Sequence, residues 1–126
     1  MGPATVRRAV ETVLLGERAR PATAVSVTFL SASRMRELNR RVLKRDRVTD
    51  VIAFGLSHAG GLAADIYVCP AAARAAGAGS SREELVRLVV HGTLHATGRV
   101  HPEGAGRERS AMWRRQEGYV RRLMGR

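Results

Sequence analysis

Apolar residues recur along the chain with two different periods. Near the N-terminus, Val6, Val10, Val13 and Leu14 are spaced three or four residues apart, which predicts an amphipathic helix from about Thr5 to Arg18. The next segment, residues 24–30, alternates between apolar and polar positions and is rich in β-branched side chains. This alternation is typical of a strand.

Helical spacing returns after Ser31 and Ser33, which are both candidate N-caps. The side chains expected to face inward from this second helix are Met35, Leu38, Val42 and Leu43. The opposite face is rich in arginine, so the helix is predicted to be amphipathic and basic.

Two short apolar segments, residues 51–54 and 62–69, follow a charged loop. Gly55 and the Gly60–Gly61 pair lie between them and offer the backbone conformations that a tight turn requires. We therefore expect a β-hairpin. Pro70 then opens a short Ala-rich helix, because proline is favoured at the first helical position.

The segment from about Arg82 to Thr97 is apolar on more than one helical face, which predicts a central buried helix that ends at Gly98. Ser81 and Glu84 match a capping box at its start. A last basic amphipathic helix is expected from about Arg107 to Leu123. The order of elements is thus helix, strand, helix, strand, strand and further helices, which predicts a chain that mixes helices with a small sheet.

The length of 126 residues suits one domain spanning residues 1–126. Cys69 is the only cysteine, so an intramolecular disulfide is excluded, and we expect it to be buried. The sequence contains no long apolar stretch and no signal-peptide core, which favours a cytoplasmic protein without membrane insertion.

The formal net charge of +11 adds a functional indication, because such a field attracts polyanions. Lys44 is the only lysine, and all other basic residues are arginines. A bias in coding explains the choice of arginine but not the excess of basic over acidic residues. The charge therefore favours nucleic acid as a partner.

Three of the four histidines, His91, His95 and His101, fall within eleven consecutive residues at the end of the predicted central helix. Residues i and i+4 lie on one helical face, about 5–6 Å apart at Cβ, which lets two imidazoles share a metal ion at about 2.0–2.1 Å. Gly98 allows the chain to leave the helix, so His101 is able to return as a third ligand. Three histidines with an open fourth position are typical of a catalytic zinc site, where bound water becomes a nucleophile near neutral pH.

The same histidine offsets occur in metallopeptidases, which makes proteolysis an alternative. Peptidases of that kind need a glutamate directly after the first histidine, and this position is Gly92. Glu84, Asp65 and Asp50 are carboxylates that would have to replace it. Gly92 also has a structural explanation, close packing of the helix against the sheet. His58 is interpreted as a surface residue.

The segment HGTLHATGRVH resembles the HGxLHLxGYDH signature of the YbeY family of bacterial endoribonucleases. Two further segments support the resemblance. Leu38–Asn39, Asp46 and residues 49–54 are similar to the family's LN…D.PTDVLSFP stretch, and residues 65–69 are similar to its GDIxIC strand. The resemblance covers roughly residues 24–120.

The resemblance implies a mixed α/β (α+β) fold, a small mixed sheet of the four-stranded type with helices packed on it and a central, buried metal-binding helix. The predicted order of elements is compatible with this fold. The resemblance also implies one metal ion per chain, usually zinc, held by His91, His95 and His101, and endoribonuclease activity on ribosomal RNA in maturation and quality control. Phosphate contacts are expected from Arg41, Lys44 and Arg45, which lie on the second helix and the following loop. No catalytic residue is predicted beyond the metal ligands.

At two positions the chain differs from the family pattern. Leu43 occupies the place of an arginine implicated in acting on RNA, and Val100 that of an aspartate before the third histidine. These differences favour the second alternative, a non-catalytic RNA- or ribosome-associated protein with a structural metal. The sequence leaves open the RNA cleaved, the oligomeric state, and whether zinc or another imidazole-binding ion is used.

Overall fold

The computed structural model describes residues 1–19, 23–58, 61–76, 81–97 and 110–126. The helices and strands, in chain order, are α1 (Pro3–Gly16), β1 (Ala24–Phe29), α2 (Ala32–Leu38), the π-helix η1 (Asn39–Leu43), β2 (Val51–His58), β3 (Gly61–Val68), α3 (Pro70–Ala75), α4 (Ser81–Ala96) and α5 (Ala111–Leu123). This order agrees with the predicted one. The predicted start of the last helix at Arg107, like Gly98, lies outside the described residues.

The sheet of the described residues has three strands in the order β1-β3-β2, so the predicted four-stranded type is corrected to three here. β2 and β3 are antiparallel and form the expected hairpin, whereas β1 is parallel to β3. Val27 of β1 and Ala53 of β2 both pair with Ile66 of β3, and all three belong to the core on one face of the sheet. The mixed sheet with helices packed on it confirms the predicted α/β class.

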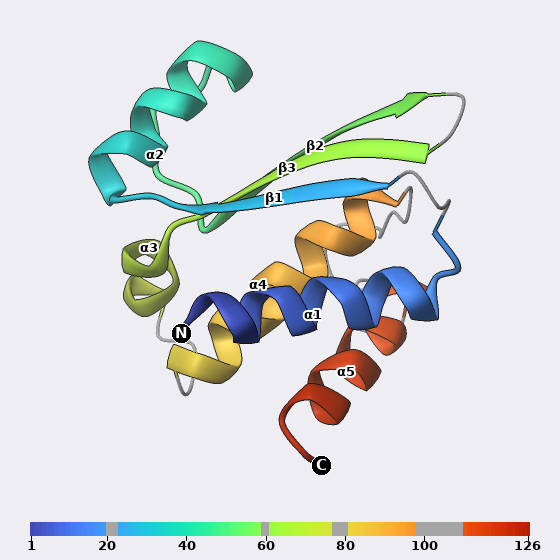
Figure 1. The fold of residues 1–126 in the computed structure, drawn as a ribbon. Helices are drawn as coiled ribbons and strands as arrows, with labels where there is room; N and C mark the ends of the chain where they lie inside the picture. The colour runs from blue at the N-terminus through green and yellow to red at the C-terminus, as the bar shows by residue number, and fades with distance from the viewer. Residues whose placement is uncertain (20–22, 59–60, 77–80, 98–109) are drawn as a thin grey trace.

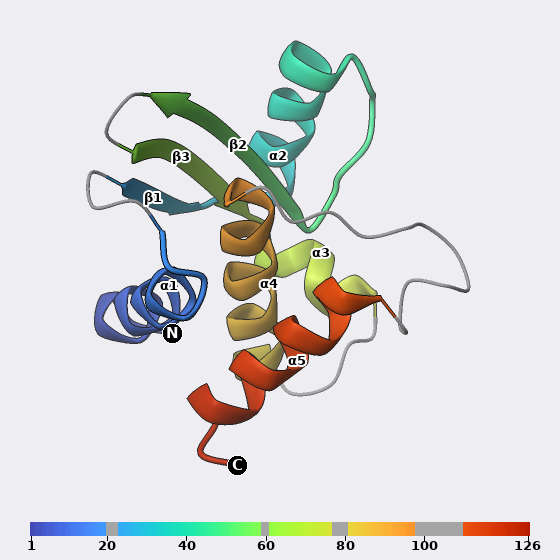
Figure 2. The same cartoon turned by 90° about the vertical axis from the view of Figure 1, so that its right-hand side faces the viewer.

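Helix α4 lies at the centre of the molecule, as predicted. One of its faces packs with α1 against the sheet, where Leu88 and Val89 contact the cluster that contains Ile66. Another face packs on α5, as Figure 2 shows. This face contributes Val90 and Leu94 to a second cluster. An apolar surface on more than one side is what a helix with neighbours on more than one side requires.

Gly92 marks the closest approach of α4 to the sheet. A Cβ at this position would lie 2.7 Å from Cγ2 of Ile66, so a larger residue would overlap the core. The structural explanation of Gly92 is therefore confirmed.

Helix α2 and η1 lie on the other side of the sheet from α1 and α4 (Figure 1). Met35 and Cys69 are completely buried there and form a cluster with Ile52, whose exposed fraction is 7%. The prediction for Met35 and Cys69 is thereby confirmed. The prediction that Val42 and Leu43 face inward is wrong, because their exposed fractions are 44% and 40%. Both residues lie in η1, where the wider π-helical turn departs from the 3.6-residue period and moves their side chains off the apolar stripe.

Side-chain caps begin two of the helices. Ser31 Oγ accepts a hydrogen bond from the Arg34 amide at 3.3 Å, and Ser110 Oγ accepts one from the Trp113 amide at 3.1 Å.

Among the described residues, no helix has both the length and the apolar character needed to cross a membrane.

Candidate metal centre

His91 and His95 lie one turn apart on α4, at the edge of the helix nearest β2. Their ring centroids are 4.6 Å apart and the rings are inclined by 69°. Both side chains are partly buried, while Thr93 and Leu94 between them are completely buried. The prediction that the two imidazoles share one face is confirmed, and this face has the donor atoms that zinc prefers.

His101, the predicted third ligand, lies outside the described residues. Within the part of the chain that the structure describes, no group of three histidine, cysteine, aspartate or glutamate side chains could hold a metal ion. The three-histidine set therefore remains a prediction, of which the structure brings two members together.

The ring of His91 is held by Gln116 of α5. The distance from His91 Nδ1 to Gln116 Oε1 is 2.7 Å, and the exposed fraction of Gln116 is 3%. With Nδ1 engaged, Nε2 is the atom through which His91 would bind a metal. Sequence reasoning missed Gln116, although a polar side chain on the apolar stripe that contains Met112 and Tyr119 was a usable signal.

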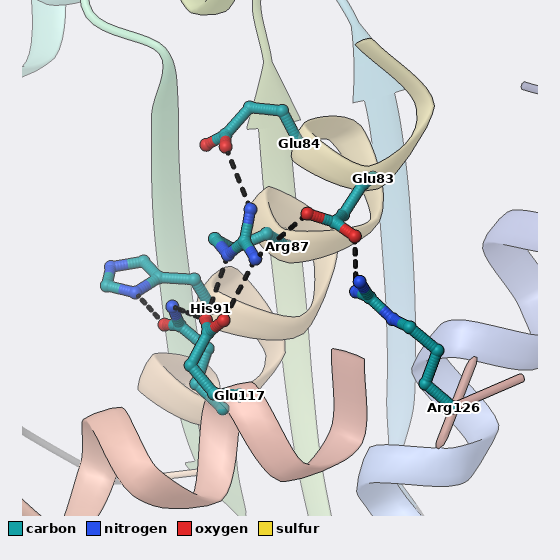
Figure 3. A network of polar contacts seen from close by, with 7 residues as sticks. Glu83, Glu84, Arg87, His91, Glu117 and Arg126 are labelled. Carbon is teal, nitrogen blue, oxygen red and sulfur yellow. Dashed lines mark hydrogen bonds and ion pairs between the residues drawn. The ribbon is translucent and has the colours of Figure 1, made fainter. Parts of the chain in front are cut away.

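Gln116 is the first member of a polar network between α4 and α5. Figure 3 labels His91, Glu117 and Arg87 of this network. The Gln116 amide donates to Glu117 at 3.1 Å, and Glu117 accepts two hydrogen bonds from Arg87, at 2.8 and 2.9 Å. Arg87 also donates to Glu84 at 3.1 Å and to Glu83 at 3.4 Å. The network thus extends from the histidine pair to the N-terminal turn of α4.

Charge within this network is stabilised by its partners. Burial alone would raise the pKa of the Glu117 carboxyl, but the hydrogen bonds from Arg87 and Gln116, together with the positive charges of Arg87 and Arg121, lower this pKa. The hydrogen bond to Glu117 raises the pKa of Arg87 above its usual value. Glu117 is therefore an ionised acceptor and Arg87 a permanently charged donor.

The histidine pair opens onto a pocket of about 420 Å³ between α4, β2 and the loop before β2. Its lining residues are Leu43, Arg45, Arg47, Thr49, Val51, Ile52, Ala53, Phe54, His91, Gly92 and His95. Imidazoles and guanidinium groups therefore face the same space, which suits a substrate that carries phosphates. A larger cavity of about 550 Å³ between α1 and β1 is mainly apolar, so it offers less chemistry.

The three residues predicted to contact RNA do not all line this pocket. Arg45 lines the pocket, and Arg47, which was not singled out from the sequence, lines it as well. Arg41 and Lys44 are not among the lining residues. Arg41 lies 3.8 Å from Glu37, and Lys44 donates to the Arg41 carbonyl at 3.2 Å.

Two side chains, those of Asp46 and Thr49, hold the loop that carries Arg45 and Arg47. Asp46 accepts hydrogen bonds from Arg36 and Arg40, both at 2.7 Å, and these bonds hold the pKa of its carboxyl far below the usual range. On the inner side, buried Asn39 donates to Thr49 Oγ1 at 3.1 Å. The loop is therefore fixed to α2 and η1 at both ends.

The carboxylates considered as the general base of a peptidase do not line this pocket. Asp65 is exposed on the sheet face opposite α4 and accepts a hydrogen bond from Ser26 at 2.6 Å. Glu84 pairs with Arg87, and neither Glu84, Asp65 nor Asp50 lines the pocket. The described residues thus place no carboxylate in the pocket beside the histidines.

Comparison with known proteins agrees with this geometry. The sequence model of the family described as Endoribonuclease YbeY matches residues 3–124. The Endoribonuclease YbeY of Chlorobium luteolum is 31% identical over 120 residues, which are 92% of this chain and 85% of that protein. The Endoribonuclease YbeY of Desulfitobacterium hafniense is 37% identical over 115 residues, covering 80% of this chain and 71% of that protein.

A solved structure extends the similarity to the fold. The solution structure of TM1509 from Thermotoga maritima has a TM-score of 0.65 and 29% identity, and the match covers 97% of this chain and 81% of that chain. The resemblance drawn from the histidine segment is thereby confirmed, together with the enzyme class that it implied, a hydrolase of the nuclease type. The chain belongs to the Endoribonuclease YbeY family.

Proposed function

We propose that this protein is a metal-dependent endoribonuclease that acts on ribosomal RNA in its maturation and quality control. The observation that carries the proposal is the shared pocket, in which the two imidazoles of α4 face the guanidinium-bearing loop before β2. Family membership supports the reaction class, because the relatives carry the name endoribonuclease.

His91, His95 and His101 would hold the metal, zinc by preference, and the chemistry of two imidazoles at this spacing fits it. When bound, zinc supplies a Lewis acid for the scissile phosphate and lowers the pKa of a water molecule. The remaining work belongs to the chain. Arg45 and Arg47 bind phosphates next to the site, and Gln116 fixes the ring of His91.

The substrate is expected to be single-stranded RNA read through its backbone and shape. The net charge of +11 favours a polyanion, while one Trp, two Tyr and two Phe are too few for an extended base-stacking platform. Cleavage of RNA in a reducing cytoplasm also agrees with a single buried cysteine.

The direct test is cleavage of single-stranded RNA by metal-depleted protein before and after addition of Zn²⁺. We expect cleavage only after addition, and none by the His91→Ala, His95→Ala double variant at the same zinc concentration. Cleavage by the metal-depleted protein at the full rate would contradict the proposal.

A second candidate is a non-catalytic RNA-associated protein whose metal only stabilises the fold. One observation favours it, since Leu43, in place of the arginine of the family pattern, is among the residues that line the pocket. In that case metal-depleted protein would unfold, and zinc-loaded protein would bind RNA without cutting it. Circular dichroism with the cleavage assay separates the two candidates.

A further inference from the structure

The distance between His91 and Gln116 does not by itself show which of the two residues donates the hydrogen bond. Nδ1 of a neutral imidazole either donates or accepts, depending on which ring nitrogen carries the proton. The amide of Gln116 also has two orientations, with its oxygen or its NH₂ group toward His91. The neighbours of Gln116 remove this ambiguity.

The direction is fixed from the far end of the network. The guanidinium of Arg87 has only donors, and it approaches Glu117 through two nitrogens at 2.8 and 2.9 Å. The pKa of Glu117 is lowered by these bonds, so its carboxylate has only acceptors. The group of Gln116 that lies 3.1 Å from Glu117 must therefore be the NH₂ donor.

The opposite end of the same amide is then the carbonyl oxygen, 2.7 Å from His91 Nδ1. A carbonyl oxygen only accepts, so Nδ1 must carry a proton, and the lone pair of the neutral ring lies on Nε2. Gln116 is 3% exposed, so water does not readily replace either contact. Each group in the series has only one role open to it.

We propose that Arg87, Glu117 and Gln116 act as positioning residues that set the Nδ1–H tautomer of His91 and thereby present Nε2 to the metal. This inference deepens the proposed function and rests on it for the identity of the ligand. Gln116 lies 25 positions along the chain from His91, and Arg87 is 30 positions from Glu117, so the device depends on the packing of α4 on α5. The three residues orient a ligand of the metal and are not ligands themselves.

The first measurement is the tautomer of His91 in metal-free protein, by long-range ¹H–¹⁵N NMR at a pH where the imidazole is neutral. We expect the proton on Nδ1 in the wild type. Gln116→Met removes the acceptor, so the preference for Nδ1–H should be lost. A proton on Nε2 in the wild type would overturn the proposal.

Glu117→Gln is the second variant and does not touch His91. The introduced amide provides donors where the carboxylate had none, so Gln116 is no longer restricted to one orientation. Glu83→Gln is the matched control, because it makes the same change on another partner of Arg87 that does not contact Gln116. We expect a mixed tautomer in Glu117→Gln and an unchanged one in Glu83→Gln.

The second measurement is Zn²⁺ affinity by competition with a chromophoric chelator. Loss of a partner that orients a metal-binding histidine typically weakens metal affinity about 10–100-fold. We expect a weakening in this range for Gln116→Met, a smaller one for Glu117→Gln, and none for Glu83→Gln. Wild-type affinity in both Gln116→Met and Glu117→Gln would contradict the proposal.

The two measurements separate this inference from the proposed function. The tautomer is observed without metal and without RNA, so it does not require that the protein cut anything. Wild-type protein with the Nδ1–H tautomer but without Zn²⁺ binding would support the assignment of the tautomer and contradict the metal-dependent nuclease.

Discussion

At the scale of single residues, Gly92 shows how packing restricts chemistry. The position directly after the first histidine of the pair is where a peptidase would carry its glutamate. Here it faces Ile66, which is completely buried, and even a methyl group would come within 2.7 Å of it. The contact of α4 with the sheet therefore excludes a larger side chain from this position.

Gly92→Ala should destabilise the protein by roughly 1–3 kcal/mol, the usual cost of overpacking, less the gain of about 1 kcal/mol in helix propensity. Gly118→Ala on α5 is the matched control. A Cβ there would meet only Arg121 Nη2, at 4.0 Å, so this variant should be slightly more stable than the wild type. Urea unfolding measures both, and a Gly92→Ala variant as stable as Gly118→Ala would contradict this explanation.

The lowered pKa of Glu117 makes the free energy of unfolding depend on pH. The folded pKa lies below the ordinary value of 4.5, so ionised Glu117 stabilises the fold above that pH. This stabilisation is lost as the pH falls through the folded pKa. In metal-free protein, Glu117→Gln should therefore cost roughly 1–3 kcal/mol at pH 7 and progressively less below about pH 4.5.

The measurement is the free energy of unfolding of both proteins as a function of pH. A difference between wild type and Glu117→Gln that stays constant from neutral pH down to the acid limit would contradict the assigned pKa direction.

At the scale of elements, the loop before β2 places positive charge beside the histidine pair. Asp46 ties the loop to α2 through Arg36 and to η1 through Arg40, and Thr49 ties it to Asn39 of η1. Arg36 and Arg40 are thereby occupied by an acidic partner. Arg45 and Arg47 line the pocket instead, which makes them the expected phosphate contacts.

The Arg45→Ala, Arg47→Ala double variant should weaken RNA binding and reduce the slope of log affinity against log salt concentration by about 1 per lost phosphate contact. Arg7→Ala, Arg8→Ala is the matched control, since it removes the same charge from two exposed residues of α1. Fluorescence anisotropy over a salt series compares the variants. Equal salt slopes in the two double variants would show that net charge, and not the loop, governs binding.

The elements also show which predictions from sequence succeed. Helix α4 and the hairpin of β2 and β3 were predicted because their apolar periods are local and their turns contain glycine. Val42 and Leu43 were assigned wrongly because a π-helical turn gives no clear signal in the periodicity. The sheet of the described residues has three strands and not four, because strand pairing depends on contacts distant in sequence.

At the scale of the whole molecule, the candidate site forms where α4, α5 and the loop before β2 meet. His91 and His95 were predictable because their spacing on one helix fixes their relation. Gln116 and Arg87 were not predicted as site residues, because their roles arise only when α5 packs on α4. His101 remains a prediction, since it lies outside the described residues.

The central claim is that the histidine pair of α4 builds a metal centre. Elemental analysis of purified wild-type protein, beside the His91→Ala, His95→Ala double variant, tests it most directly. We expect about one zinc or other divalent transition-metal ion per chain in the wild type and none in the variant. Metal-free wild-type protein after incubation with zinc, or equal metal content in the two proteins, would contradict the claim.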